Sequence, residues 1–407
     1  MRFRILIIAG LFFLPKFAFT GQGDTTTVEG LFYIDEKPVS IRIAEGRIAK
    51  IIPLPNGSGK PEVYVAPGFI DIQINGFMGI NFSDQALTTE KMRKATQALW
   101  KEGVTSYLPT VITNDHSRLK KSFMLLADAT SDKKIEGSVP GFHLEGPFIS
   151  PVQGYRGAHS EKYIRPPDQN EFRILQDASG NKIKLITVAP EIPGAISFIE
   201  KVARSGVTVS LGHHNGTTGI IQEAVEAGAQ LSTHLGNGCA NEINRHWNPI
   251  WPQLANDGLS ISIICDGSHL NRDEVITFYK VKGNGMTILV SDALYLAGMS
   301  PGEYTDDEGV TLLLTEDVVK LPAENVLAGA AQSIRRCTEN MMAFTGCSLK
   351  EAMQMASTNP ARLLQLNDRG ELKPGMRADL ILFTLDKGKI TIQKTIVAGE
   401  EVYRAEK

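Results

Sequence analysis

Apolar runs that end in polar residues alternate with amphipathic stretches along the middle of the chain, from about residue 67 to residue 365. The apolar runs predict strands, and the stretches between them repeat their apolar residues with a helical spacing. Two of the helical stretches, residues 88–103 and 219–229, have a glycine at the C-terminal end, where glycine commonly follows a helix. Eight strands are predicted, at residues 68–76, 104–111, 139–147, 183–191, 207–214, 229–236, 259–267 and 286–293.

Eight strands that alternate with helices match the number needed for a closed (β/α)8 barrel of the TIM type. The strands are nearly continuous in apolar residues, which is typical of a parallel sheet buried on both faces. An open doubly wound sheet is the competing α/β fold, but no G-x-G-x-x-G turn follows an early strand. We therefore predict an α/β chain whose main domain, residues 67–369, is a (β/α)8 barrel.

The two ends of the chain have a different pattern, with alternating β-type residues interrupted by glycine. Residues 24–66 and residues 370–407 are each too few to bury a good core. We expect both ends to combine into one small β-sandwich domain beside the barrel.

The first twenty residues carry positive charge, then a short apolar run, then small residues. Arg2 and Arg4 precede the apolar stretch 5–14, and Ala18 and Thr20 follow it. This is the order of a secretory signal, and the run is too short for an ordinary membrane span. We expect residues 1–20 to be a signal peptide and the mature protein to have no stable membrane insertion. A wrongly assigned start codon or a buried strand is the alternative.

Composition excludes several classes of protein. Apolar residues make up 42% of the chain and charged residues 21%, which is wrong for a disordered chain. The net charge of −3 gives no basic surface for a nucleic acid. The four cysteines show no C-x-x-C spacing, so we expect buried thiols at Cys239, Cys265, Cys337 and Cys347.

Acidic and histidine residues lie at the C-terminal ends of several predicted strands, and their positions indicate an active site. In a parallel barrel the C-terminal ends of all strands meet at one rim, where the active site lies. Glu145, His213 and His234 provide two imidazoles and one carboxylate, a ligand set that leaves a position open for water on a catalytic metal ion. Asp292, at the end of the last strand, is placed to take a proton from that water.

Other histidines are weaker candidates. His213 and His214 are adjacent, so a regular strand would point only one of them at the metal. His143 lies on the same face as Glu145, and we expect it to be structural.

Ten motifs along the chain resemble those of the N-acetylglucosamine-6-phosphate deacetylases, a family of the amidohydrolase superfamily. In order they are PGFIDIQING, FHLEGPFIS, RGAHS, TVAPE, SLGHHNG, STHLGN, ICDGSH, LVSDA, LAGA and ELKPGMRADLILF, between residues 67 and 383. The resemblance implies a metal-dependent hydrolase that converts N-acetyl-D-glucosamine 6-phosphate to D-glucosamine 6-phosphate and acetate. It also implies that Glu145, His213 and His234 bind the metal and that Asp292 is the catalytic acid and base.

The resemblance further implies a substrate-binding set around this centre. Ala158 and His159 would contact the substrate near the acetamide, and Asn237, Gly238 and His269 would contact the sugar phosphate. Leu327, Ala328 and Gly329 would belong to a segment that closes over the substrate. Arg245 would bind the phosphate, reaching the site of the neighbouring subunit in a homodimer.

The chain departs from the superfamily pattern at the first strand. Many amidohydrolases have H-x-H there, which contributes to a second metal, whereas this chain has Gln73-Ile74-Asn75. Amides are poor zinc ligands, so we expect a single divalent ion, zinc or alternatively iron(II). The stretch after His234 also differs from the family pattern, which leaves the fine recognition of the substrate open.

Alternative functions keep the same fold. The chain could act on another N-acetylated sugar or on an N-acyl amino acid, or it could be a sugar-binding relative without turnover. The presence of Asp292 argues against the last, because a site without turnover has no chemical need for it. A functional signal peptide would place the enzyme in the periplasm. Without one, the cytoplasm, where sugar phosphates normally occur, is expected.

Overall fold

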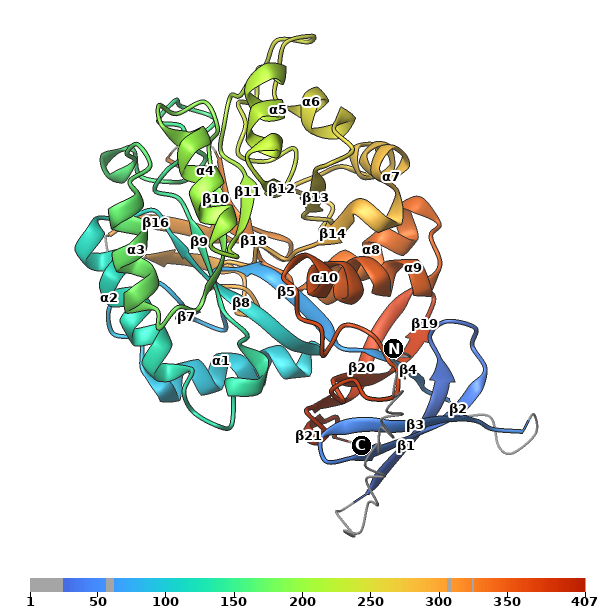
Figure 1. The fold of residues 1–407 in the computed structure, drawn as a ribbon. Helices are drawn as coiled ribbons and strands as arrows, with labels where there is room; N and C mark the ends of the chain where they lie inside the picture. The colour runs from blue at the N-terminus through green and yellow to red at the C-terminus, as the bar shows by residue number, and fades with distance from the viewer. Residues whose placement is uncertain (1–24, 56–61, 306–308, 324–325, 407) are drawn as a thin grey trace, which may run out of the picture.

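The computed structural model describes residues 25–55, 62–305, 309–323 and 326–406. The expected signal peptide lies outside these residues. Figure 1 shows a large barrel ringed by helices and a smaller β domain at its side. Among the described residues, no helix is both long enough and apolar enough to cross a bilayer.

The barrel is built from eight parallel strands, as the alternation of strands and helices predicts. In spatial order they are β5 (Phe69–Ile74), β8 (Val104–Ile112), β9 (Phe142–Glu145), β10 (Ile183–Val188), β11 (Thr208–Leu211), β12 (Ala229–Ser232), β13 (Ser260–Ile263) and β14 (Thr287–Leu289). A parallel bridge between Ile74 and Ala293 joins the first strand to the segment after the last. The Asp292 amide donates to the Gln73 carbonyl at 2.9 Å, which closes the barrel beside the expected active site.

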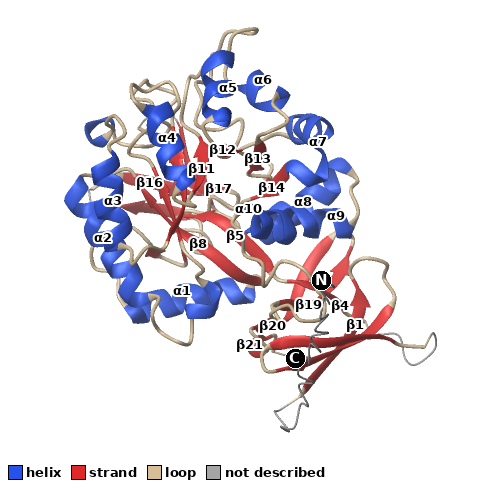
Figure 2. Cartoon of the chain, viewed as in Figure 1, coloured by secondary structure: helices blue, strands red, loops and turns tan. Residues whose placement is uncertain are grey.

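Helices cover the outside of the barrel (Figure 2). They are α1 (Thr89–Lys101), α2 (His116–Ala129), α3 (Gln169–Ala178), α4 (Ala195–Arg204), α5 (Thr218–Glu226), α6 (Ile250–Ala255), α7 (Arg272–Met286), α8 (Ile334–Thr345), α9 (Leu349–Met353) and α10 (Asn359–Leu363). Helix α1 shows why the sequence folds this way: Thr88 caps its N-terminus, and Met92 and Leu99 are buried against the strands. It ends before Gly103, whose φ of 81° is a conformation that glycine adopts at little cost.

The two ends of the chain form one small β domain, as expected. Strands β1 (Thr26–Phe32), β2 (Pro38–Ala44), β3 (Arg47–Pro53) and β4 (Tyr64–Pro67) come from the N-terminal part. Strands β19 (Leu380–Asp386), β20 (Lys389–Val397) and β21 (Glu400–Arg404) come from the C-terminal part. All seven are hydrogen-bonded in the order β21-β20-β19-β4-β1-β2-β3. The two ends of this sheet come into contact with each other. Gly46, in the β2–β3 turn, packs against Ala398 and Gly399 in the β20–β21 turn.

A four-stranded antiparallel sheet between the last barrel strand and α8 was not expected from the sequence. Its strands are β15 (Gly302–Thr305), β16 (Thr311–Leu314), β17 (Val318–Leu321) and β18 (Val326–Ala330). Strand β18 is anchored to the barrel by an Ala293–Ala330 bridge. The Ala330 amide donates to the Asp292 carbonyl at 3.0 Å, so this insert lies directly beside the end of the eighth strand.

Short two-stranded and irregular elements complete the chain. Strands β6 (Gly76–Phe77) and β7 (Ile80–Asn81) form a small hairpin after the first barrel strand. Single turns of other helix types lie at η1 (Glu136–Ser138), η2 (Glu161–Tyr163) and η3 (Gln354–Thr358).

Candidate metal centre and active-site cavity

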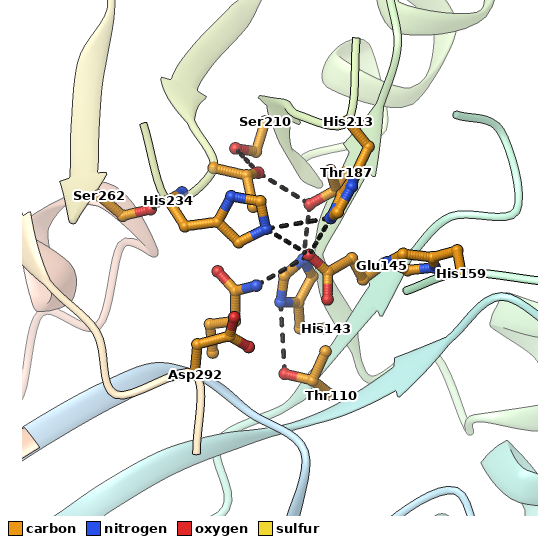
Figure 3. A network of polar contacts seen from close by, with 12 residues as sticks. Thr110, His143, Glu145, His159, Thr187, Ser210, His213, His234, Ser262 and Asp292 are labelled. Carbon is orange, nitrogen blue, oxygen red and sulfur yellow. Dashed lines mark hydrogen bonds and ion pairs between the residues drawn. The ribbon is translucent and has the colours of Figure 1, made fainter. Parts of the chain in front are cut away.

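Glu145, His213 and His234 lie together at the C-terminal rim of the barrel (Figure 3). Glu145 ends β9, whereas the two histidines each stand two residues beyond the end of their strand. The Oε1 atom of Glu145 is 3.3 Å from Nε2 of His213 and 3.1 Å from Nε2 of His234. The two Nε2 atoms are 3.1 Å apart. One ligand atom from each residue thus converges on a common point.

This donor set fits a divalent cation. The other ring nitrogen of His213, Nδ1, lies 3.1 Å from the Tyr155 carbonyl, to which it donates its proton. Its Nε2 then presents a lone pair to the carboxylate and to the second imidazole. Three such acceptors repel one another unless a proton or a cation lies between them. Two nitrogens and one oxygen with a position left for water form the ligand set of a catalytic zinc site.

Burial and the mutual interactions of the three residues shift the pKa values of Glu145 and His234. Burial alone would raise the pKa of Glu145, but the hydrogen bonds and charges of His213 and His234 outweigh it and hold that pKa well below its usual value. Burial lowers the pKa of His234, and the nearby Glu145 carboxylate more than offsets this, so the net pKa is raised. The carboxylate is therefore ionised and ready to bind a cation.

The backbone has positive φ angles at two of the candidate metal ligands and at Asp292, just beyond the ends of their strands. His213, His234 and Asp292 have φ angles of 52°, 30° and 48°, in the left-handed region that residues with a Cβ rarely adopt. Each such residue costs roughly 1–3 kcal/mol, and conformations of this kind cluster at active sites. The chain turns sharply just after each strand, which brings the side chains back over the mouth of the barrel.

Two amides on the first strand hold the site carboxylates in place. Gln73 donates from Nε2 to Oε1 of Glu145 at 2.8 Å, and Asn75 donates from Nδ2 to Oδ1 of Asp292 at 2.8 Å. The sequence identified these two residues only as poor metal ligands and missed this role. Their spacing was the available signal, because residues two apart on a strand point to the same side.

Asp292 lies in the same cavity, supported by Asn75, and its charge is disfavoured there. Burial, and then the negative charge of Glu145, raises the pKa of Asp292 to about 6. A carboxyl with such a pKa exchanges a proton readily near neutral pH, which suits a general base and acid.

His159 stands beside the cluster as a neutral ring. Its Nδ1 lies 2.7 Å from the hydroxyl of Thr113, and its ring meets that of His213 edge to face at 4.4 Å between centroids. Burial, followed by the proximity of His213, lowers the pKa of His159 to about 3. An uncharged ring does not repel a cation bound next to it. Thr113, just after the second barrel strand, is a partner that the sequence analysis did not identify.

Glu145 and His213 of the cluster, together with Asp292, line a cavity of about 820 Å³. Its volume suits a small-molecule ligand. Nearly all of the expected substrate-binding residues line it, namely Ala158, His159, Asn237, Gly238, His269, Leu327, Ala328 and Gly329. Nδ1 of His269 is 2.6 Å from the buried Asp266 carboxylate, which fixes the orientation of the ring. Arg245 is the exception, since it is exposed on the loop before α6 and does not line the cavity of its own chain.

The remaining strand-end histidines stay outside the cluster. His143 lies between two threonine hydroxyls, with Nε2 2.8 Å from Thr187 and Nδ1 3.4 Å from Thr110. His214 accepts a hydrogen bond from the Gly216 amide at 3.1 Å. Burial lowers the pKa of both rings to about 4, so both are neutral structural residues.

Comparison with known proteins gives a consistent set of similarities. Residues 64–402 match the model of the amidohydrolase family. The chain is 32% identical to the N-acetylglucosamine-6-phosphate deacetylase of Lysinibacillus sphaericus, over 89% of this chain and 93% of that protein. It is 30% identical to the N-acetylgalactosamine-6-phosphate deacetylase of Escherichia coli O157:H7, over 88% of this chain and 93% of that protein.

Solved structures of N-acetylglucosamine-6-phosphate deacetylases are also similar to this chain. The N-acetylglucosamine-6-phosphate deacetylase of Thermotoga maritima superposes with a TM-score of 0.82 at 30% identity, covering 93% of this chain and 100% of that one. A mutant of the Mycobacterium smegmatis enzyme in complex with N-acetyl-D-glucosamine-6-phosphate gives a TM-score of 0.81 at 26% identity, covering 90% and 94% of the two chains.

Proposed function

The chain belongs to the amidohydrolase family and, within it, to the N-acetylglucosamine-6-phosphate deacetylases, and from this we infer its reaction. It hydrolyses the acetamide of N-acetyl-D-glucosamine 6-phosphate to D-glucosamine 6-phosphate and acetate. The observation that carries this assignment is the convergence of Glu145, His213 and His234, beside a cavity that Asp292 also lines.

The residues of the cavity account for each proton transfer. Glu145, His213 and His234 would hold a divalent cation, which would supply Lewis acidity and lower the pKa of water. Asp292, held through Oδ1 by Asn75, accepts the proton of the attacking water on its other oxygen. It then delivers this proton to the amine, which is a poor leaving group unless protonated. His159 donates from Nε2 to the carbonyl oxygen as charge develops there, with the Thr113 hydroxyl donating to Nδ1.

One zinc ion per chain is the metal that we propose. Two imidazoles and one carboxylate suit zinc, and iron(II) accepts the same ligands. We propose no second metal at Gln73 and Asn75, because amides are poor zinc ligands and the amide nitrogens of these two residues donate to Glu145 and Asp292.

The experiment that tests this function is acetate release by the purified, metal-loaded protein. The substrates are N-acetylglucosamine 6-phosphate, its galactosamine epimer, unphosphorylated N-acetylglucosamine and an N-acetyl amino acid. We expect the highest kcat/KM on the first. The epimer is a specific second candidate, because one relative bears that activity in its name. No acetate from any substrate would support a binding protein without turnover.

The rate should depend on pH through Asp292. The residue must be ionised to accept a proton, so activity is lost as pH falls through its pKa, which is about 6 without a cation. A bound cation lowers the pKa of a neighbouring carboxyl. We therefore expect an acidic limb in kcat/KM with its midpoint at or below about pH 6, measured on the phosphorylated substrate between pH 4 and 8. A profile still rising between pH 7 and 8 would contradict this role.

We also propose that the protein is a homodimer in which Arg245 completes the partner's site. Arg245 is exposed and outside its own cavity, and two large apolar side chains near it are also exposed, Trp247 to 82% and Trp251 to 51%. Exposed tryptophans beside a cation are typical of interfaces.

Replacing both tryptophans by serine should therefore convert a dimer to a monomer in sedimentation velocity. It should also raise KM for the phosphorylated sugar about as much as Arg245→Met does. The exposed Trp residues make no core contact, so folding should persist, which thermal unfolding checks. A wild-type monomer with full activity would refute the shared site.

A further inference from the structure

In the described part of the chain, the cavity lining has three carboxylates and one permanently cationic side chain. Among the described residues that line it, the carboxylates are Glu145, Asp292 and Glu274. The single lysine or arginine in that lining is Lys320, on strand β17 of the antiparallel insert. Lys320 is therefore the one lysine or arginine of the described chain that lines the cavity and can offer a positive charge to an anionic end of the substrate.

Lys320 and its neighbour Leu321 both contribute to the lining of the cavity. Val319 and Leu321, its neighbours in sequence, are buried in a small apolar cluster with Leu312 and Leu314, whereas Lys320 is exposed. Cross-strand pairing sets Lys320 opposite Leu313 on one side and Leu327 on the other. Leu313 and Leu327 also line the cavity, so this row of three side chains forms part of its wall.

The ammonium group of Lys320 is uncommitted within the described part of the chain. The described residues give Lys320 no hydrogen-bond or ion-pair partner, and its two cross-strand neighbours are leucines that offer no charge. Lysine is also depleted in strands, where β-branched and aromatic residues pack better. A long cationic side chain set in an apolar row at the wall of a cavity points to a ligand.

The antiparallel insert fixes the separation between Lys320 and Asp292. Strand β18 is bound to the end of the eighth barrel strand, with the Ala330 amide on the Asp292 carbonyl. Leu327, the partner of Lys320, lies two residues before Gly329, which packs on that same carbonyl. Two residues span roughly 7 Å along a strand, and the next strand is about 5 Å away. This separation leaves room for one sugar ring between Asp292 and the ammonium group.

We propose that Lys320 is the cation of this same chain that binds the phosphate of the substrate and sets the preference for phosphorylated sugars. This deepens the proposed function and rests on it. An ammonium group forms charge-assisted hydrogen bonds with phosphate oxygens and acts as a point charge from a flexible stem. Arg245 of the partner subunit would then be a second cation, and the preference would not depend on the dimer alone.

The test compares kcat/KM on N-acetylglucosamine 6-phosphate with kcat/KM on N-acetylglucosamine at low ionic strength. Lys320→Met should lower this ratio about tenfold, the effect of losing one charge-assisted contact. Lys320→Arg should retain most of the ratio. Lys280→Met, on the exposed face of α7, is the matched control and should leave the ratio as in the wild type. Salt should reduce the wild-type ratio more than that of Lys320→Met, because salt screens exposed charges.

A second measurement covers the case in which the plain sugar turns over too slowly. Competitive inhibition by inorganic phosphate should weaken about tenfold in Lys320→Met and stay constant in Lys280→Met. An unchanged ratio and an unchanged phosphate inhibition in Lys320→Met would overturn the inference while leaving the deacetylase assignment intact. A wild-type protein that releases no acetate from either sugar would instead remove the proposed function itself.

Discussion

Replacing Asp292 by asparagine lowers kcat at least about a hundredfold, the usual scale for general acid–base catalysis. The amide has the shape of the carboxylate and can still accept the hydrogen bond from Asn75 at its oxygen, but it cannot accept the water proton. The same substitution removes the carboxyl group whose pKa is raised to about 6. Any residual activity should therefore lose the acidic limb of the wild-type pH–rate profile. The measurement is steady-state acetate release on the phosphorylated sugar.

Two controls separate this chemical effect from a structural one. Asp292 is outside the group of three convergent ligand atoms, so the variant should bind metal as the wild type does, by elemental analysis. Asp386→Asn, at the exposed end of β19, makes the same chemical change far from the cavity and should have wild-type kcat. A kcat for Asp292→Asn equal to that of the wild type would show that another group moves the proton.

Glu145→Gln should abolish stable metal binding. The glutamine keeps the volume of the side chain but loses the charge that His213 and His234 both face at 3.1–3.3 Å. Removing a residue that merely supports a metal ligand typically costs 10- to 100-fold in affinity, so losing a ligand itself should cost more than about 100-fold. After dialysis, elemental analysis should find close to one ion per wild-type chain and almost none in the variant.

The control for this variant is a partly buried carboxylate on the same rim. Glu191 follows the fourth strand and accepts the Asn215 amide at 2.7 Å, outside the ligand cluster. Glu191→Gln should retain the metal and the activity. Full metal content in Glu145→Gln would mean that the ion lies elsewhere in the protein.

The sequence predicted the barrel and the position of its candidate centre for one physical reason. In a parallel sheet, the direction of every strand is the same, so residues that end different strands must meet at one rim. Glu145, His213, His234 and Asp292 are far apart in the chain and could be grouped without knowing any distance. Near-continuous apolar runs predicted the strands, and the polar residues at the ends of those runs were the candidate site residues.

What the sequence did not predict depends on local backbone geometry and on contacts between strands. The left-handed conformations of His213, His234 and Asp292 could not be predicted from residue type, because histidine and aspartate adopt them more often than most residues but far less often than glycine. The hydrogen bonds from Gln73 and Asn75 join the first strand to the third and the last, and only the closure of the barrel brings them together. Strands β15 and β17 of the insert mix polar with apolar residues, unlike the near-continuous apolar runs that predicted the barrel strands.

Strand β4 joins the beginning of the chain to its end. It pairs with β1 on one side and with β19 on the other, and β19 starts only at Leu380, whereas β4 ends at Pro67. During synthesis at about 5–20 residues per second, a ribosome needs on the order of half a minute to produce the partner of that edge. For that time the nascent chain carries an unpaired β edge, which is a template for wrong association. The pairing of β4 with β19 should therefore create a need for chaperones during translation. A premature stop codon before β19 would leave the β4 edge permanently unpaired.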